Sequence, residues 1–137
     1  MIAIVADRID IEAVRAAVTQ AFAGAELVFC GVARDNFGGK SVHELVYEAY
    51  APMAEAVLRE IVSEVEAKWP GSRAAIVHRT GTVAIGEPSV VIAVSTPHRG
   101  ECYEASRYAI EALKARVPVW KKEIYADGSA WKANTPG

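Results

Sequence analysis

Two lysines near the end of the chain, Lys114 and Lys121, lie on either side of Pro118. A lysine amine that is partly desolvated or close to another cation loses proton affinity, and its neutral form can attack an acyl carbon. Pro118 must end the preceding helix, so both lysines flank a single helix–strand corner. A structural role explains both lysines more simply at this point. Lys114 would offset the negative end of its helix dipole, and Lys121 would pair with Glu123 on an exposed strand.

Other cationic side chains stand at the predicted ends of helices and strands. Arg34 opens a glycine-containing loop, His78 and Arg79 end one strand, and His98 and Arg99 begin the last helix. The free N–H groups and the dipole of a helix N-terminus favour an anion, and flanking cations strengthen such a site. The pattern favours a pocket for phosphate or carboxylate, although each residue alone is also explained as a solvated or ion-paired surface charge.

The familiar catalytic constellations are missing from the sequence. It contains no GxGxxG or GxxxxGK[ST] phosphate loop and no GxSxG nucleophile elbow. His98 and Cys102 have a spacing that could serve a metal, but no further ligands accompany them. Cys30 and Cys102 form no CxxC pair and are expected to be buried free thiols in a reducing compartment. We therefore predict neither a metal nor a cofactor.

Three helices are expected to position these side chains. Asp10 is a predicted N-cap for a helix whose apolar stripe runs from Val14 to Phe22 and stops at Gly24. A long helix begins near Pro52 and ends at residues 70–71. The last helix is opened by residues 96–97 and runs to about Arg116, with small residues along its buried side.

The remaining apolar segments alternate in polarity or are rich in strand formers. Strands are predicted over residues 2–6, 26–32, 42–50, 74–78, 83–85, 90–95 and 119–125, with a turn at 127–128 and a short return at 130–132. Several of these strands follow one another without a helix between them, which implies antiparallel pairing. The predicted class is α+β: one domain over residues 1–137, with a mostly antiparallel sheet and three helices.

The overall composition narrows the possible classes of protein. The chain has 137 residues and a net charge of −2, whereas a nucleic-acid-binding protein would carry a clear basic excess. No apolar run free of charges approaches the ~20 residues of a membrane span. Charged residues enter at Asp7 and Arg8, before a signal-peptide apolar region could develop. We expect a cytoplasmic protein that binds neither nucleic acid nor membrane.

Four blocks of the sequence, in this order, resemble the large, catalytic subunit of molybdopterin synthase. They are FCGVARDNFGGKSVHELVYEAY (29–50), WPGSRAAIVHRTGTVAIGE (69–87), AVSTPHRGECYEA (93–105) and LKARVPVWKKEIYADGSAW (113–131). The similarity extends from about residue 25 to residue 131. Several motifs in order with compatible spacing are more specific than any one of them.

The resemblance implies a fold of the α+β hammerhead type and a sulfurtransferase activity. The family converts cyclic pyranopterin monophosphate into molybdopterin by installing a dithiolene, a step of molybdenum cofactor biosynthesis. The sulfur arrives as a thiocarboxylate on the Gly-Gly C-terminus of a small ubiquitin-like carrier subunit. The large subunit is expected to form a homodimer within a heterotetramer.

The same resemblance assigns roles to individual residues. Lys114 would lie beside the thiocarboxylate carbonyl, and Lys121 would donate a proton or act electrostatically. Arg34, His98 and Arg99 would bind the pterin phosphate, from one protomer or from both. Glu123 is a supporting candidate that could orient a lysine or accept a proton.

Two other hypotheses stay open on sequence grounds. The chain could be a non-catalytic homodimer that docks the carrier or binds an anion, in which case it would form a complex and no dithiolene. It could also be an unrelated acyl-transfer enzyme. The presence of Lys114 and Lys121 favours the synthase, because a degenerate relative could lose both lysines freely.

Overall fold

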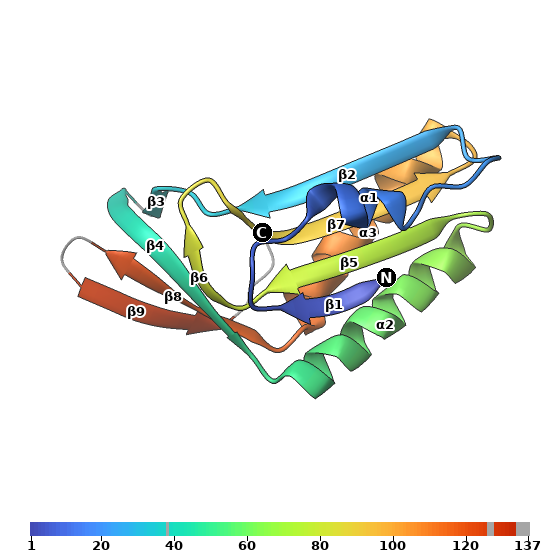
Figure 1. Cartoon of the computed structure of the whole chain (residues 1–137). Coiled ribbons are helices and arrows are strands. Elements are labelled where there is room, and N and C mark those ends of the chain that lie inside the picture. Colours follow the sequence, from blue (N-terminus) through green and yellow to red (C-terminus); the bar gives the residue numbers. More distant parts are fainter. Residues whose placement is uncertain (38, 126–127, 134–137) are drawn as a thin grey trace.

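The computed structural model describes residues 1–37, 39–125 and 128–133 (Figure 1). Its elements, in chain order, are β1 (Ile2–Val5), α1 (Ile11–Ala16), β2 (Ala25–Val32), β3 (Asn36–Phe37), β4 (Lys40–Ala49), α2 (Ala51–Lys68), β5 (Arg73–Arg79), β6 (Gly81–Ala84), β7 (Pro88–Thr96), α3 (Arg99–Arg116), β8 (Val119–Tyr125) and β9 (Gly128–Ala133).

The strands form two sheets. The first has the order β1-β5-β7-β2, and the second has the order β3-β4-β8-β9, with β6 also paired to β4. Figure 1 shows the second sheet projecting from one end of the first. The predicted α+β class with mostly antiparallel strands is confirmed. One pair differs, because β1 lies parallel to β5, with Ile2 opposite Ile76. Adjacency in sequence could not reveal this pairing, since more than 60 residues separate the two strands.

Helices cover both faces of the first sheet. Alternate side chains of a strand point to opposite faces. Accordingly, Ile76 and Ile92 pack in the core cluster that contains the buried residues of α2 and α3, whereas Val77 and Val91 pack in a second cluster with Val14 of α1. Every residue of β7 is buried, as expected for a strand between two layers of helix.

The predicted face of α3 is the buried one. Cys102, Ala105, Ala109 and Leu113 are all buried, and Ser106 joins them. Small side chains bring the helix close to the sheet, where the Cys102 thiol donates a hydrogen bond to the carbonyl of Val94 over 3.4 Å. This close packing sets the distance between α3 and the first sheet.

The first helix is shorter than the apolar stripe predicts. It ends at Ala16, and Phe22 is largely exposed. The next two backbone hydrogen bonds run from the Val18 N–H to the Arg15 carbonyl and from the Thr19 N–H to the Ala16 carbonyl. Each connects residues three apart, which is the tighter 3₁₀ pattern, so the α-helix ends here. The carbonyl of Val18 is then taken by the hydroxyl of Ser95 at 2.5 Å. A tertiary hydrogen bond therefore replaces continuation of the helix.

The predicted loop over residues 34–40 contains the two-residue strand β3, in which Asn36 pairs with Ser41. The predicted short return near residue 130 is β9, which pairs antiparallel to β8. Of the turn predicted between them, Asp127 lies outside the described residues. No helix in the described part of the chain is both long and apolar enough to cross a membrane.

Asp10 caps α1 as predicted, because its carboxylate accepts a hydrogen bond from the Ala13 N–H at 3.1 Å. We expect Asp10→Ala to lower the free energy of unfolding by about 1 kcal/mol, the usual cost of losing an N-cap. Urea denaturation would measure this change. Asp10→Asn is the matched control, since asparagine caps as well as aspartate, and an equal loss in both variants would contradict a capping role.

Candidate functional site

Lys114, Lys121 and Arg34 line one cavity of about 270 Å³ at the junction of the two sheets and α3. The three residues come from the last turns of α3, from β8 and from the segment after β2. They are more than 80 positions apart in sequence at the extremes, and the fold brings them to one place. The cavity therefore concentrates positive charge from three separate elements.

Lys114 is half-buried near the C-terminal end of α3. Desolvation by burial lowers the pKa of its amine, and the nearby charge of Lys121 lowers it further. Both effects disfavour the ammonium form. Some of the Lys114 amine is therefore neutral and nucleophilic at a pH where an exposed lysine is almost wholly protonated.

The alternation of side chains along β8 determines the direction in which Lys121 points. It lies opposite Tyr47 of β4, and Glu123, two residues later on the same face, lies opposite Leu45. The Lys121 amine is 3.9 Å from the carboxylate of Glu123, whose side chain is only 1% exposed. The hydroxyl of Tyr125 donates to the same carboxylate at 2.5 Å. One face of β8 thus carries a lysine, a buried carboxylate and a tyrosine in sequence.

The backbone around Arg34 is fixed by the neighbouring turn. The N–H of Ala33 donates to the carbonyl of Glu87 at 3.0 Å, and the carbonyl of Ala33 accepts from the N–H of Gly86 at 2.7 Å. Gly86 has a φ of +87°, a conformation that favours glycine. These bonds hold Arg34, whose side chain is exposed, at the rim of the cavity.

The inner wall of the cavity is mostly uncharged. Tyr47 is buried there, and burial raises the pKa of its phenol. Its ring meets the imidazole of buried His78 edge to face, with 5.4 Å between the ring centroids. Burial lowers the pKa of His78 to about 4, and the charge of Lys114 acts in the same direction. The phenol of Tyr47 and the imidazole of His78 are therefore both neutral near pH 7.

His98 and Arg99 lie elsewhere. They line a separate cavity of about 650 Å³ with Gly24, Pro97 and Gly100, at the N-terminal end of α3. Arg99 precedes Lys114 by 15 residues of continuous helix, which corresponds to roughly 22 Å at 1.5 Å per residue. Within one chain, the described structure does not bring His98 or Arg99 to the lysine cavity.

Comparison with known proteins identifies the family of this chain. A family model described as "MoaE protein" matches residues 4–116. The chain belongs to the MoaE family. It is 47% identical over 129 residues to the molybdopterin synthase catalytic subunit of Homo sapiens, covering 94% of this chain and 69% of the relative. It is 54% identical over 109 residues to the protein of that name from Bacillus subtilis, covering 80% and 69%.

A solved structure agrees with the fold of this MoaE-family chain. The X-ray crystal structure of molybdopterin synthase from Staphylococcus aureus superposes with a TM-score of 0.91 at 46% identity and covers 94% of each chain. The overall fold of this chain is therefore that of a solved molybdopterin synthase structure.

Neither Cys30 nor Cys102 lines the lysine cavity of this MoaE-family chain. Burial raises the pKa of both thiols, which disfavours the reactive thiolate. Among residues 1–37, 39–125 and 128–133, no three His, Cys, Asp or Glu side chains gather in a way that could hold a metal. His98 is the N-cap residue of α3, while Cys102 points at the sheet.

Several lining residues had no signal in the sequence. Tyr47 and Leu45 lie in the strand predicted over residues 42–50, but nothing marked one face of that strand as the wall of a site. Ser89 and Ile110 were not singled out at all, although both line the cavity. The predicted strand alternation could have identified Tyr47 and Leu45 only if the pairing of β4 with β8 had been known.

Proposed function

We propose that this chain is the catalytic subunit of a molybdopterin synthase. It would transfer sulfur from the thiocarboxylated C-terminus of a small carrier subunit to cyclic pyranopterin monophosphate and form the dithiolene of molybdopterin. The observation that carries the proposal is the meeting of Lys114, Lys121 and Arg34 in one cavity. The similarity to proteins named molybdopterin synthase catalytic subunit supports it.

Lys114 is the proposed principal catalytic residue. Its lowered pKa provides neutral amine that could add to the carbonyl carbon of the thiocarboxylate, and its ammonium form could instead stabilise negative charge developing on that group. Lys121 would donate a proton or act electrostatically, with Glu123 holding its amine in place. The sulfur comes from the carrier in either case, so the proposal requires no metal, no cofactor and no cysteine relay.

Arg34 is the proposed ligand of the substrate phosphate at the rim of the cavity. His98 and Arg99 are the other proposed anion ligands, and the length of α3 separates them from Lys114 by roughly 22 Å within one chain. Both sets could contact one substrate only if a second copy supplied His98 and Arg99. We therefore propose a homodimer with composite sites, which becomes a heterotetramer when each protomer binds a carrier. The free cysteines fit a cytoplasmic setting.

Reconstitution from purified components tests the proposed function. The chain is mixed with cyclic pyranopterin monophosphate and with carrier that ends either in a thiocarboxylate or in an ordinary carboxylate. We expect dithiolene only with the thiocarboxylated carrier, and binding of both carriers. A stable complex that forms no dithiolene would instead show a carrier-docking module, and the enzymatic proposal would be wrong.

A further inference from the structure

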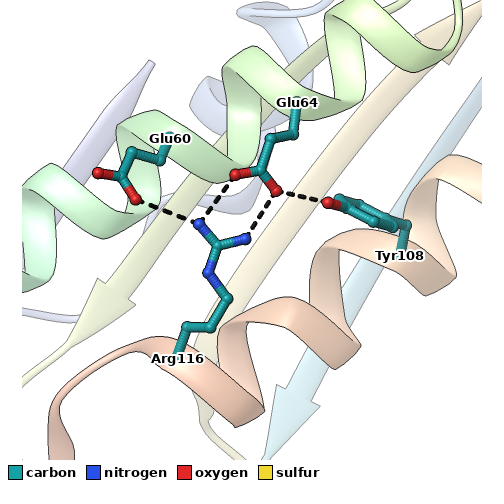
Figure 2. A network of polar contacts seen from close by, with 4 residues as sticks. All are labelled: Glu60, Glu64, Tyr108 and Arg116. Carbon is teal, nitrogen blue, oxygen red and sulfur yellow. Dashed lines mark hydrogen bonds and ion pairs between the residues drawn. The ribbon is translucent and has the colours of Figure 1, made fainter.

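A cluster of charged residues joins the end of α3 to α2, outside the lysine cavity. The Arg116 guanidinium donates through Nη1 to Glu64 Oε1 at 2.6 Å and through Nη2 to Glu64 Oε2 at 2.9 Å. Nη2 also reaches Glu60 at 3.2 Å, and the hydroxyl of Tyr108 donates to Glu64. Figure 2 shows the guanidinium lying between the two glutamates. We call these four residues the Arg116 clamp.

The clamp has the geometry of a strong ion pair. Both oxygens of Glu64 accept from one guanidinium, and this paired arrangement fixes direction as well as distance. The hydrogen bond from Arg116, followed by that from Tyr108, lowers the pKa of Glu64 to about 2. Glu64 therefore stays ionised throughout the pH range in which a lysine amine could react, and the clamp stays closed.

A second ion pair on the same helix differs in what it connects. Arg107 and Glu111 form an exposed pair at 3.1 Å, one turn apart within α3. Such a pair contributes little and ties the helix only to itself. The Arg116 clamp instead connects α3 to another helix, at the terminal turn where helices otherwise fray.

Arg116 and Lys114 belong to the same turn but face different neighbours. Two residues along an α-helix correspond to about 200° of rotation, so the two side chains leave the helix on nearly opposite sides. Lys114 lines the cavity, while Arg116 contacts α2. Any movement of this turn away from α2 would displace the Lys114 backbone and admit water around its amine.

We infer that Arg116 is a positioning residue: by holding the last turn of α3 against α2, the clamp keeps the Lys114 amine desolvated and in place within the cavity. The inference deepens the proposed function and rests on it for its catalytic consequence. Its structural consequence, the environment of Lys114, can be measured without any turnover.

Any measurement of the Lys114 pKa has to be interpreted with the titratable groups that face it. Lys121 and Glu123 face the cavity region from β8, Arg34 from the segment after β2, Tyr47 from β4 and His78 from β5. Arg116→Ala changes none of these side chains. Arg116→Ala removes a positive charge and Glu64→Gln a negative one, so a direct effect of charge on the pKa of Lys114 would have opposite signs in the two variants. An upward shift in both variants would therefore arise from movement or hydration of the helix end.

Amine labelling across a pH series, with the modified lysines identified by mass spectrometry, tests the inference directly. In Arg116→Ala we expect the midpoint for labelling of Lys114 to shift upward relative to wild type. Arg107→Ala, which removes the other ion pair of α3, should leave that midpoint unchanged. If Arg116→Ala does not fold, Glu64→Gln breaks the same ion pair and should give the same shift.

The catalytic consequence is measured in the reconstituted reaction. We expect Arg116→Ala to lower the turnover rate about tenfold at saturating carrier, with an unchanged KM for carrier and partial recovery in Arg116→Lys, because small displacements of a reacting group are costly. A Lys114 midpoint equal to that of wild type would overturn the inference. If wild type formed no dithiolene, the proposed function would fail, while the labelling result would still decide the role of the clamp.

Discussion

Lys114→Ala is expected to lower dithiolene formation by about 10²–10⁴-fold, the range that one positioned acid, base or nucleophile contributes. The fold should survive, because the substitution removes a partly desolvated cation and leaves the buried neighbour Leu113 unchanged. Single-turnover kinetics with thiocarboxylated carrier would measure the loss. Carrier affinity, measured separately, should stay close to that of wild type.

Lys122→Ala is the matched control for this prediction. Lys122 is adjacent to Lys121 on β8, but the alternation of the strand directs it to the other face, and it is not among the residues that line the cavity. The control should retain most of the activity. Equal losses in Lys114→Ala and Lys122→Ala would indicate a general effect of positive charge and would contradict the assignment.

Lys114→Arg separates the two roles that remain open for Lys114. Arginine keeps the positive charge and can donate hydrogen bonds, but it does not lose its proton in proteins and cannot act as a nucleophile. Substantial activity in this variant would indicate electrostatic stabilisation. Activity as low as that of Lys114→Ala would indicate that the neutral amine is required.

The stability of the fold is expected to decrease below neutral pH because of His78. In the folded chain, burial lowers the pKa of its imidazole to about 4, whereas an unfolded histidine titrates near 6.5. As the pH falls from about 6.5 to 4, the unfolded state gains a proton that the folded state does not. The free energy of unfolding should therefore fall by about 3 kcal/mol across this window.

Urea denaturation at several pH values between 7.5 and 4 would measure this loss. His78→Gln is the informative variant, because an amide stays neutral and can still donate to the carbonyl of Arg79, which the imidazole Nδ1 meets at 2.9 Å. The loss should shrink by about 3 kcal/mol in this variant and persist in His43→Gln, where the side chain is exposed. The same pH dependence in wild type and His78→Gln would exclude His78 as its source.

Local patterns were sufficient to predict most elements of the fold. The stripe of small residues along α3 and the alternation of β4 depend only on neighbours in sequence. The stripe is buried as predicted, and the strand predicted over residues 42–50 forms and ends at Ala49. The end of α1 depends instead on Ser95, which is distant in sequence and takes the carbonyl of Val18. The parallel pairing of β1 with β5 has a similar long-range origin.

The candidate site was predictable only in part, for a geometric reason. Pro118 places Lys114 and Lys121 at one corner, so their proximity follows from local structure. The surrounding wall depends on the register of β4 against β8 and on the position of α3, which no local pattern encodes. The large distance between Arg99 and Lys114 could have been predicted from the length of α3, since a continuous helix of 18 residues keeps its two ends far apart.

The central claim is that the cavity lined by Lys114, Lys121 and Arg34 receives the C-terminal tail of a carrier protein. Amine labelling of the chain in the presence of carrier tests it most directly, using full-length carrier and a carrier that lacks its last two glycines. We predict that full-length carrier protects Lys114 and Lys121 from labelling, whereas the truncated carrier binds without protecting them. Equal protection by both carriers, or labelling of Lys114 unaffected by bound full-length carrier, would contradict the claim.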